Sequence, residues 1–182
     1  MRGVEIQRGN RADHRRYVRV MDLNVTFRKD VRPDDRTTVR KIVEATGYFS
    51  GDETDVAVEL VEEHLTKGEA SGYHFLFAEA EGAVIGYAVY GPCPATLYSY
   101  DIYWMAVLPD FQGRGMGGKL LAMCESLIQG KGGRQIYMDT SARAQYESTR
   151  RLYVARGYLQ AAYLSDFYAP GDAKITYVKV IA

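Results

Sequence analysis

Apolar and polar positions alternate along the chain in a pattern that predicts short strands and amphipathic helices. Val25–Arg28 alternates like a strand, and Asp34 or Asp35 can cap a helix in which Val39, Ile42 and Val43 recur at helical spacing. A second helix is expected from about Asp52. Its apolar stripe ends at Gly68 and consists of Val56, Leu60, Val61 and Leu65.

The middle of the chain predicts an antiparallel start to a sheet. Residues 74–80 and 83–90 alternate on either side of Glu81-Gly82, which indicates a hairpin. Residues 97–107 then form a long aromatic strand. The following apolar stripe predicts a helix that stops at residues 130–133; it includes Leu120, Leu121, Cys124, Leu127 and Ile128.

The last third predicts a change to parallel pairing and then a closing hairpin. The strand Gln135–Asp139 follows a helix, so its crossover is right-handed and parallel to the earlier strand. A helix over 145–156 ends at Gly157, and two strands close around residues 169–172. The order indicates a single mixed α/β (α+β) domain with a mostly antiparallel sheet, over residues 23–182.

A glycine-rich turn between a strand and a helix is the most informative segment. It runs from Trp104 to Lys119. Backbone N–H groups at a helix start, together with the helix dipole, favour an anion such as phosphate, and Arg114 adds a cation. The residues that would supply this site are Gly113, Arg114, Gly115, Met116, Gly117 and Gly118.

Two phosphate-binding motifs compete for this turn. A kinase-type P-loop needs Ser or Thr after Gly118-Lys119, but Leu120 follows. The dinucleotide fingerprint G-x-G-x-x-G is present at Gly113, Gly115 and Gly118, with Asp139 at a distance suited to a ribose-binding acid. Residues 109–112 separate the first glycine from its strand, so a dinucleotide module remains only a remote alternative.

The whole segment resembles the acetyl-CoA signature of the GNAT N-acetyltransferase superfamily, through its apolar strand end, proline turn and Gln112–Gly117. Residues 151–158 resemble the second signature of that superfamily, an aliphatic-Tyr pair before Gly and an aromatic. The resemblance covers roughly residues 25–182. It implies acetyl-CoA as co-substrate, a sheet splayed between its fourth and fifth strands, and about four flanking helices.

The resemblance also implies roles for individual residues. Tyr153 takes the place of the tyrosine that protonates the CoA thiolate, and Tyr146 stands where relatives carry an asparagine that contacts the cofactor. Other cofactor contacts would come from Gln112–Gly118 and from the backbone of Met105, Ala106 and Val107. The alternative for Tyr153 is ordinary helix packing.

Amine acetylation also needs a base, because an amine with a pKa of about 10.4 must lose a proton before it attacks a thioester. Asp139 and Asp101 are the candidates, with Glu79 a weaker third. The structural alternatives are that Asp139 caps a turn with Thr140 and Ser141, and that Asp101 merely begins a strand.

The acceptor pocket is expected to be aromatic and rich in hydroxyls, from Thr96, Tyr98, Tyr100, Tyr103 and Tyr168, with Asp166 and Phe167 beside them. Such a pocket suits a small polar amine: an amino acid, amino sugar or polyamine-like molecule. These aromatics can equally be sheet packing. A protein or peptide N-acetyltransferase and a non-catalytic acyl-CoA sensor remain alternatives.

Composition agrees with a cytoplasmic enzyme. The 182 residues are 47% hydrophobic, and Lys+Arg and Asp+Glu each number 23, so neither a nucleic-acid partner nor a membrane segment is indicated. Two cysteines and three histidines show no metal-ligand spacing. Residues 1–22 are rich in arginine and are expected to form a flexible extension. Homodimerisation through the closing strands is left open.

Overall fold

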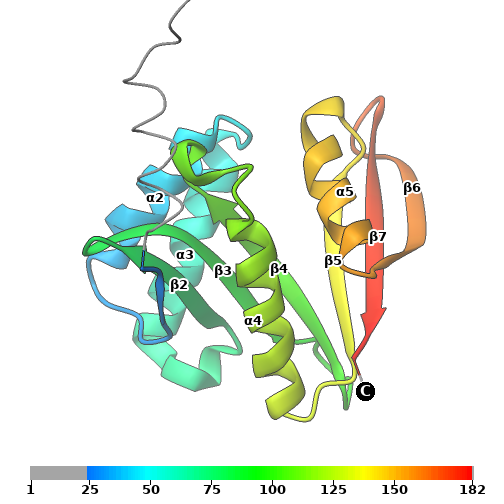
Figure 1. Cartoon of the computed structure of the whole chain (residues 1–182). Coiled ribbons are helices and arrows are strands. Elements are labelled where there is room, and N and C mark those ends of the chain that lie inside the picture. Colours follow the sequence, from blue (N-terminus) through cyan, green and yellow to red (C-terminus); the bar gives the residue numbers. More distant parts are fainter. Residues whose placement is uncertain (1–23, 182) are drawn as a thin grey trace, which may run out of the picture.

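The computed structural model describes residues 24–181 and contains one seven-stranded sheet in the order β1-β2-β3-β4-β5-β7-β6 (Figure 1). The strands are β1 Thr26–Arg28, β2 His74–Ala80, β3 Ala83–Pro92, β4 Ser99–Val107, β5 Gln135–Ser141, β6 Leu159–Ala169 and β7 Asp172–Val180. The helices are α2 Asp35–Thr46, α3 Gly51–Lys67, α4 Met116–Gly130 and α5 Glu147–Ala155. Three 3₁₀ turns connect them: η1 Gly68–Ser71, η2 Pro109–Phe111 and η3 Ala144–Tyr146.

The strand pairing confirms the predicted mixed sheet. All neighbouring strands are antiparallel except β4 and β5, which are parallel and paired only over three residues, Ser99–Asp101 against Gln135–Tyr137. Beyond that point the two strands diverge, as Figure 1 shows between the green and yellow arrows. The sheet is therefore splayed between its fourth and fifth strands, as predicted.

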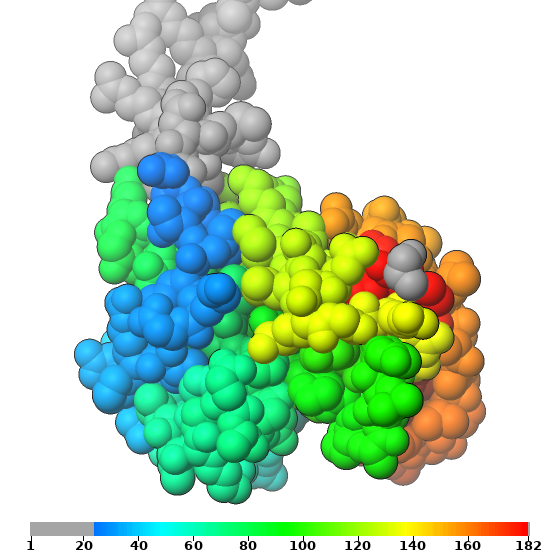
Figure 2. All heavy atoms as spheres, turned by 90° about the horizontal axis from the view of Figure 1, so that it is seen from below, coloured from blue at the N-terminus to red at the C-terminus, as the bar shows by residue number. Residues whose placement is uncertain are grey.

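Each face of the sheet carries its own apolar core. Helices α2 and α3 cover one face, where Val39, Val61 and Phe77 are fully buried. Helices α4 and α5 cover the other, where Leu120 and Tyr153 are buried. In Figure 2 the blue to teal N-terminal elements and the orange to red C-terminal elements lie on opposite sides of the molecule, with residues of about 120–140 between them.

Three local predictions need correction. Asp34 precedes α2 but makes no capping hydrogen bond with its side chain, because its backbone is already helical at φ −72°. Val56 is 47% exposed, and Ala57 is buried in its place, since the buried stripe of α3 is rotated by one residue. Strand β5 continues two residues beyond Asp139, because all seven of its residues pair with β7.

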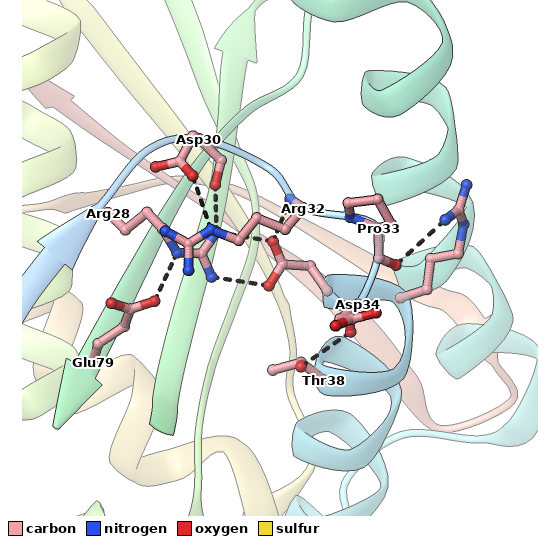
Figure 3. Close-up of polar contacts among 9 residues, drawn as sticks. Arg28, Asp30, Arg32, Pro33, Asp34, Thr38 and Glu79 are labelled. Carbon is pink, nitrogen blue, oxygen red and sulfur yellow. Dashed lines mark hydrogen bonds and ion pairs between the residues drawn. The ribbon is translucent and has the colours of Figure 1, made fainter. Parts of the chain in front are cut away.

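A buried arginine anchors the start of α2 to the sheet (Figure 3). Arg28 of β1 donates two hydrogen bonds of 2.9 Å to the carboxylate of Asp35, and its Nε donates to Glu79 of β2 at 2.6 Å. Arg28 also donates to the Asp30 carbonyl, and the Arg32 N–H donates to Asp35 at 2.7 Å. The Asp35 carboxylate is thus committed to this network, which fixes where α2 begins.

No helix within residues 24–181 is long and apolar enough to cross a membrane. The predictions for residues 1–22 lie outside the described residues.

Candidate active site

The glycine-rich loop joins β4 to α4 in a conformation that needs glycine. Gly113 and Gly115 have positive φ angles of 68° and 80°, where a side chain is strained. Gly115 is the N-cap of α4, and Gln112 closes the loop by donating from Nε2 to the Val107 carbonyl at 2.8 Å. The loop is therefore held against the end of β4 by its own glutamine.

The first backbone N–H groups of α4 precede its first intrahelical hydrogen bond. The first intrahelical bond runs from the Lys119 N–H to the Gly115 carbonyl, so the N–H groups of residues 116–118 precede it. A side chain at Gly117 would come within 3.2 Å of Leu152, so the two helices α4 and α5 approach closely here. This geometry fits a phosphate group at the helix start.

The splay leaves one edge of β4 open. The β4–β5 ladder ends at the pair Asp101–Tyr137, so within the described residues no strand lies along the β5-facing edge from Ile102 to Val107. Tyr103 is an extra residue in the pairing with β3 and forms a bulge. Met105 packs toward α4, whereas Ala106 faces the α2 and α3 core. The open edge can hydrogen-bond an extended chain such as pantetheine.

Tyr153 of α5 lies on the α4 and α5 side of the sheet. It is 5% exposed, and its ring contacts Tyr177 and Tyr158 at centroid distances of 5.5 and 6.0 Å. Burial raises the pKa of Tyr153, and nearby Tyr177 adds to the effect. The phenol therefore keeps its proton at neutral pH, as a proton donor must.

Tyr146 joins the two halves of the molecule. Its hydroxyl donates to the Tyr48 carbonyl at 3.1 Å, and the Gln145 side chain donates to the same carbonyl at 3.3 Å. Tyr48 follows α2, whereas Tyr146 belongs to η3 after β5. The loop between α2 and α3 is thereby tied across to the β5 side of the splay.

The two candidate bases share the opposite face of the sheet, the one toward α2 and α3. Asp101 lies beside Cys93, close enough for the two side chains to shift each other's pKa. Asp139 accepts from Lys174 at 2.8 Å and from Thr176 at 2.6 Å, so both of its oxygens are engaged. The structure therefore brings the two acids to one face but gives them different partners.

Burial and neighbouring charges shift the pKa values of Asp101 and Cys93. Burial raises the pKa of Asp101 above its ordinary value of 3.8, and the charge of Asp139 adds to the rise, while Cys93 and Lys174 oppose it. Burial and the adjacent Asp101 raise the pKa of the Cys93 thiol to about 12. Asp101 thus has the upward pKa shift that suits a general base.

The predicted acceptor residues fall into separate groups. Tyr103 lies on the same face of the sheet as Asp101. Burial raises the pKa of Tyr168 to about 12, and the nearby charge of Asp139 adds to the rise. Tyr100 points to the α4 side and packs near Gly133. Thr96 and Tyr98 lie in the loop before β4, where Thr96 donates to the Cys93 carbonyl and Tyr98 lies under Arg134.

The remaining candidate residues are Glu79 on β2 and two residues of β6, Asp166 and Phe167. Glu79 forms an ion pair with Arg28 of β1, so its role is structural. Asp166 has a φ of 53° and accepts from the Gly171 N–H at 2.6 Å, which shapes the turn before β7. Phe167 lies over the Lys174 ammonium, with 4.5 Å between the nitrogen and the ring centroid.

Sequence reasoning missed three side chains on the face that carries Asp101 and Asp139, namely Trp104, Lys174 and Thr176. Trp104 contacts Phe49 at a centroid distance of 4.8 Å, and Lys174 engages Asp139. The bulge at Tyr103 turns Trp104 to the same face as Tyr103, and no local sequence pattern indicates this bulge. Alternation along β7 does place Lys174 and Thr176 on one face, and their polarity in a strand with apolar Ile175 could have indicated a polar site.

Comparison with known proteins gives a consistent result. A family model described as the acetyltransferase (GNAT) domain matches residues 71–159. A crystal structure of a protein from Desulfovibrio desulfuricans, assigned to the GNAT family of acetyltransferases, is 47% identical with a TM-score of 0.85. The alignment covers 87% of this chain and 99% of that one. No curated protein matches the sequence.

Two more distant structures share the fold and contain the cofactor. An acetyltransferase from Salmonella typhimurium solved with acetyl-CoA is 20% identical, with a TM-score of 0.69 and coverage of 87% of this chain and 95% of that one. An aminoglycoside 6'-N-acetyltransferase complexed with coenzyme A is 15% identical, with a TM-score of 0.69 and coverage of 87% and 97%. The chain therefore belongs to the GNAT family and is an acetyl-CoA-dependent N-acetyltransferase.

Proposed function

We propose that the protein acetylates the primary amine of a small molecule, which approaches from the α2 and α3 side of the splay. The observation that carries this proposal is the half-buried Asp101 on that face, beside the open edge of β4. The tie between Tyr48 and Tyr146 supports a small acceptor, because it links the two halves on the side from which a peptide would have to enter.

In this mechanism Asp101 takes a proton from the acceptor ammonium, directly or through water. The neutral nitrogen then forms a bond to the thioester carbonyl carbon, and the carbon–sulfur bond breaks. Tyr153 gives its proton to the departing thiolate from the α4 and α5 side, and the nitrogen loses its second proton to solvent. Backbone N–H groups near Val107 stabilise the negative charge on the carbonyl oxygen.

The cofactor is held by the features that fit its shape. The start of α4, with Arg114 and the glycines of residues 113–118, receives the pyrophosphate. The open β4 edge at Met105–Val107 pairs with the pantetheine arm. In this proposal Tyr146 acts through its bond to Tyr48, which secures the loop beside the acceptor, rather than through the side-chain amide that relatives carry there.

The test is to incubate the protein with acetyl-CoA and a pool of amines, amino acids, amino sugars and short peptides, and to identify products by mass spectrometry. Acetylation of a small amine supports the proposal. Acetylation of peptides alone would make the protein a peptide N-acetyltransferase. Cofactor binding without any product would instead favour an acyl-CoA sensor. Direct product detection avoids interference from Cys93 and Cys124 in a thiol assay.

A further inference from the structure

The cations near the candidate base are already neutralised by carboxylates. The Lys174 ammonium lies 2.8 Å from Asp139 and is only 20% exposed. Arg143, which follows β5, lies 2.9 Å from the buried carboxylate of Asp172. On the face formed by the described residues of β4, β5 and β7, the positive charge of Lys174 is thus already paired with Asp139.

Asp101 differs from these acids because its neighbour on this face is uncharged. The Cys93 thiol lies close enough for the Asp101 carboxylate to help raise the thiol pKa, but it brings no positive charge. Lys174 lies near enough to lower the Asp101 pKa, but the charge of Asp139, which raises that pKa, opposes it. The site of proton removal is therefore acidic, with no uncommitted cation on the adjoining face of β5 and β7 within residues 24–181.

Aromatic rings of β4 lie on the same face of the sheet as Asp101. Tyr103 contacts Tyr73 edge to face at 5.2 Å, and Trp104 contacts Phe49 at 4.8 Å. Aromatic faces attract ammonium groups and offer contact area to an apolar body, but they provide no partner for a carboxylate. The rings and Asp101 thus favour the same type of ligand.

We propose that the acceptor is a primary amine with an apolar body and no carboxylate, rather than an amino acid. This inference rests on the proposed function. An α-carboxylate is only two bonds from the reacting nitrogen, so it would lie against Asp101 without a cation to pair with it. Like charges held close together in a partly buried site oppose binding strongly.

Matched pairs of substrates test this inference: tyramine with L-tyrosine, tryptamine with L-tryptophan, and phenethylamine with L-phenylalanine. We expect kcat/KM to be about tenfold or more higher for the uncarboxylated member of each pair. Equal values, or a preference for the amino acids, would overturn the inference and leave small-molecule acetylation standing. If peptides are acetylated and none of the six compounds is, both proposals fail.

Two variants change the charge at the site in opposite directions. Asp139→Asn frees the Lys174 ammonium to pair with a substrate carboxylate, so the tyramine-to-tyrosine ratio of kcat/KM should fall several-fold. Lys174→Met leaves Asp139 unpaired, so the same ratio should rise. Asp55→Asn is the control, because Asp55 pairs with Arg40 on the outer surface of the helices.

Each variant is first shown to be folded by circular dichroism and by its thermal midpoint. The inference predicts opposite shifts for the two site variants and none for the control. Ratios that stay at the wild-type value in both site variants would overturn it.

Discussion

Replacing Asp101 with asparagine separates the chemical role of its charge from its role in the fold. Asparagine has nearly the same shape and keeps a carbonyl oxygen beside the Cys93 thiol. Only the ability to take a proton is lost. Loss of a positioned general base typically slows a reaction by about 10² to 10⁴-fold, equivalent to about 3–5 kcal/mol of activation free energy.

The same substitution should stabilise the protein at neutral pH. The folded-state pKa of Asp101 is raised by burial, so the folded protein binds more protons than the unfolded chain between pH 3.8 and the raised pKa. Stability contributed by this group therefore falls as pH rises through that window. Asparagine carries no charge, so the thermal midpoint of the variant should exceed that of the wild type most at high pH.

The assay measures kcat/KM for tyramine and the thermal midpoint, both between pH 4 and 9. Wild-type kcat/KM should rise with pH through the raised pKa of Asp101, and that rise should be absent from the residual activity of Asp101→Asn. The matched comparison is Asp139→Asn, which should keep the rise. The reasoning is refuted if Asp101→Asn keeps wild-type activity, or if Asp139→Asn loses the pH dependence instead.

Three further substitutions test the fold around the site by thermal unfolding and cofactor titration. Arg28→Met leaves the buried Asp35 carboxylate without its cation and should cost about 3–5 kcal/mol, or about 6–20 °C in midpoint, while adding Asp35→Leu should recover much of the loss. Gly115→Ala forces a side chain into a left-handed conformation, costing about 1–2 kcal/mol and weakening CoA binding. Tyr146→Phe removes the bond to the Tyr48 carbonyl and should cost about 1 kcal/mol. Unchanged midpoints would contradict each of these assignments.

Local signals made much of the fold predictable. Glu81 and Gly82 both have positive φ angles, which is the two-residue hairpin turn that the sequence indicates. The glycine-rich loop was recognisable for the same reason, since Gly113 and Gly115 occupy left-handed positions that few other residues tolerate. The expected acceptor pocket, in contrast, put Tyr100 and Tyr103 together, although alternation along β4 places them on opposite faces of the sheet, as the structure does.

Contacts between distant segments were not predictable in this way. The partners of Asp139 come from β7, 35 and 37 residues along the chain, and the bond from Tyr146 to Tyr48 spans 98 residues. Pairing of this kind depends on how the sheet assembles, which no local pattern encodes. The distinction between Asp101 and Asp139 as bases therefore needed the structure.

The most direct test of the central claim is to measure CoA affinity and kcat separately for Tyr153→Phe. Phenylalanine preserves the ring contacts with Tyr158 and Tyr177, so calorimetry should give a CoA Kd within about twofold of the wild type, while kcat falls about a hundredfold. The control is Tyr163→Phe on the exposed strand β6, which should change neither value. An unchanged kcat in Tyr153→Phe would contradict the assignment of Tyr153 as the acid and the two-sided mechanism built on it.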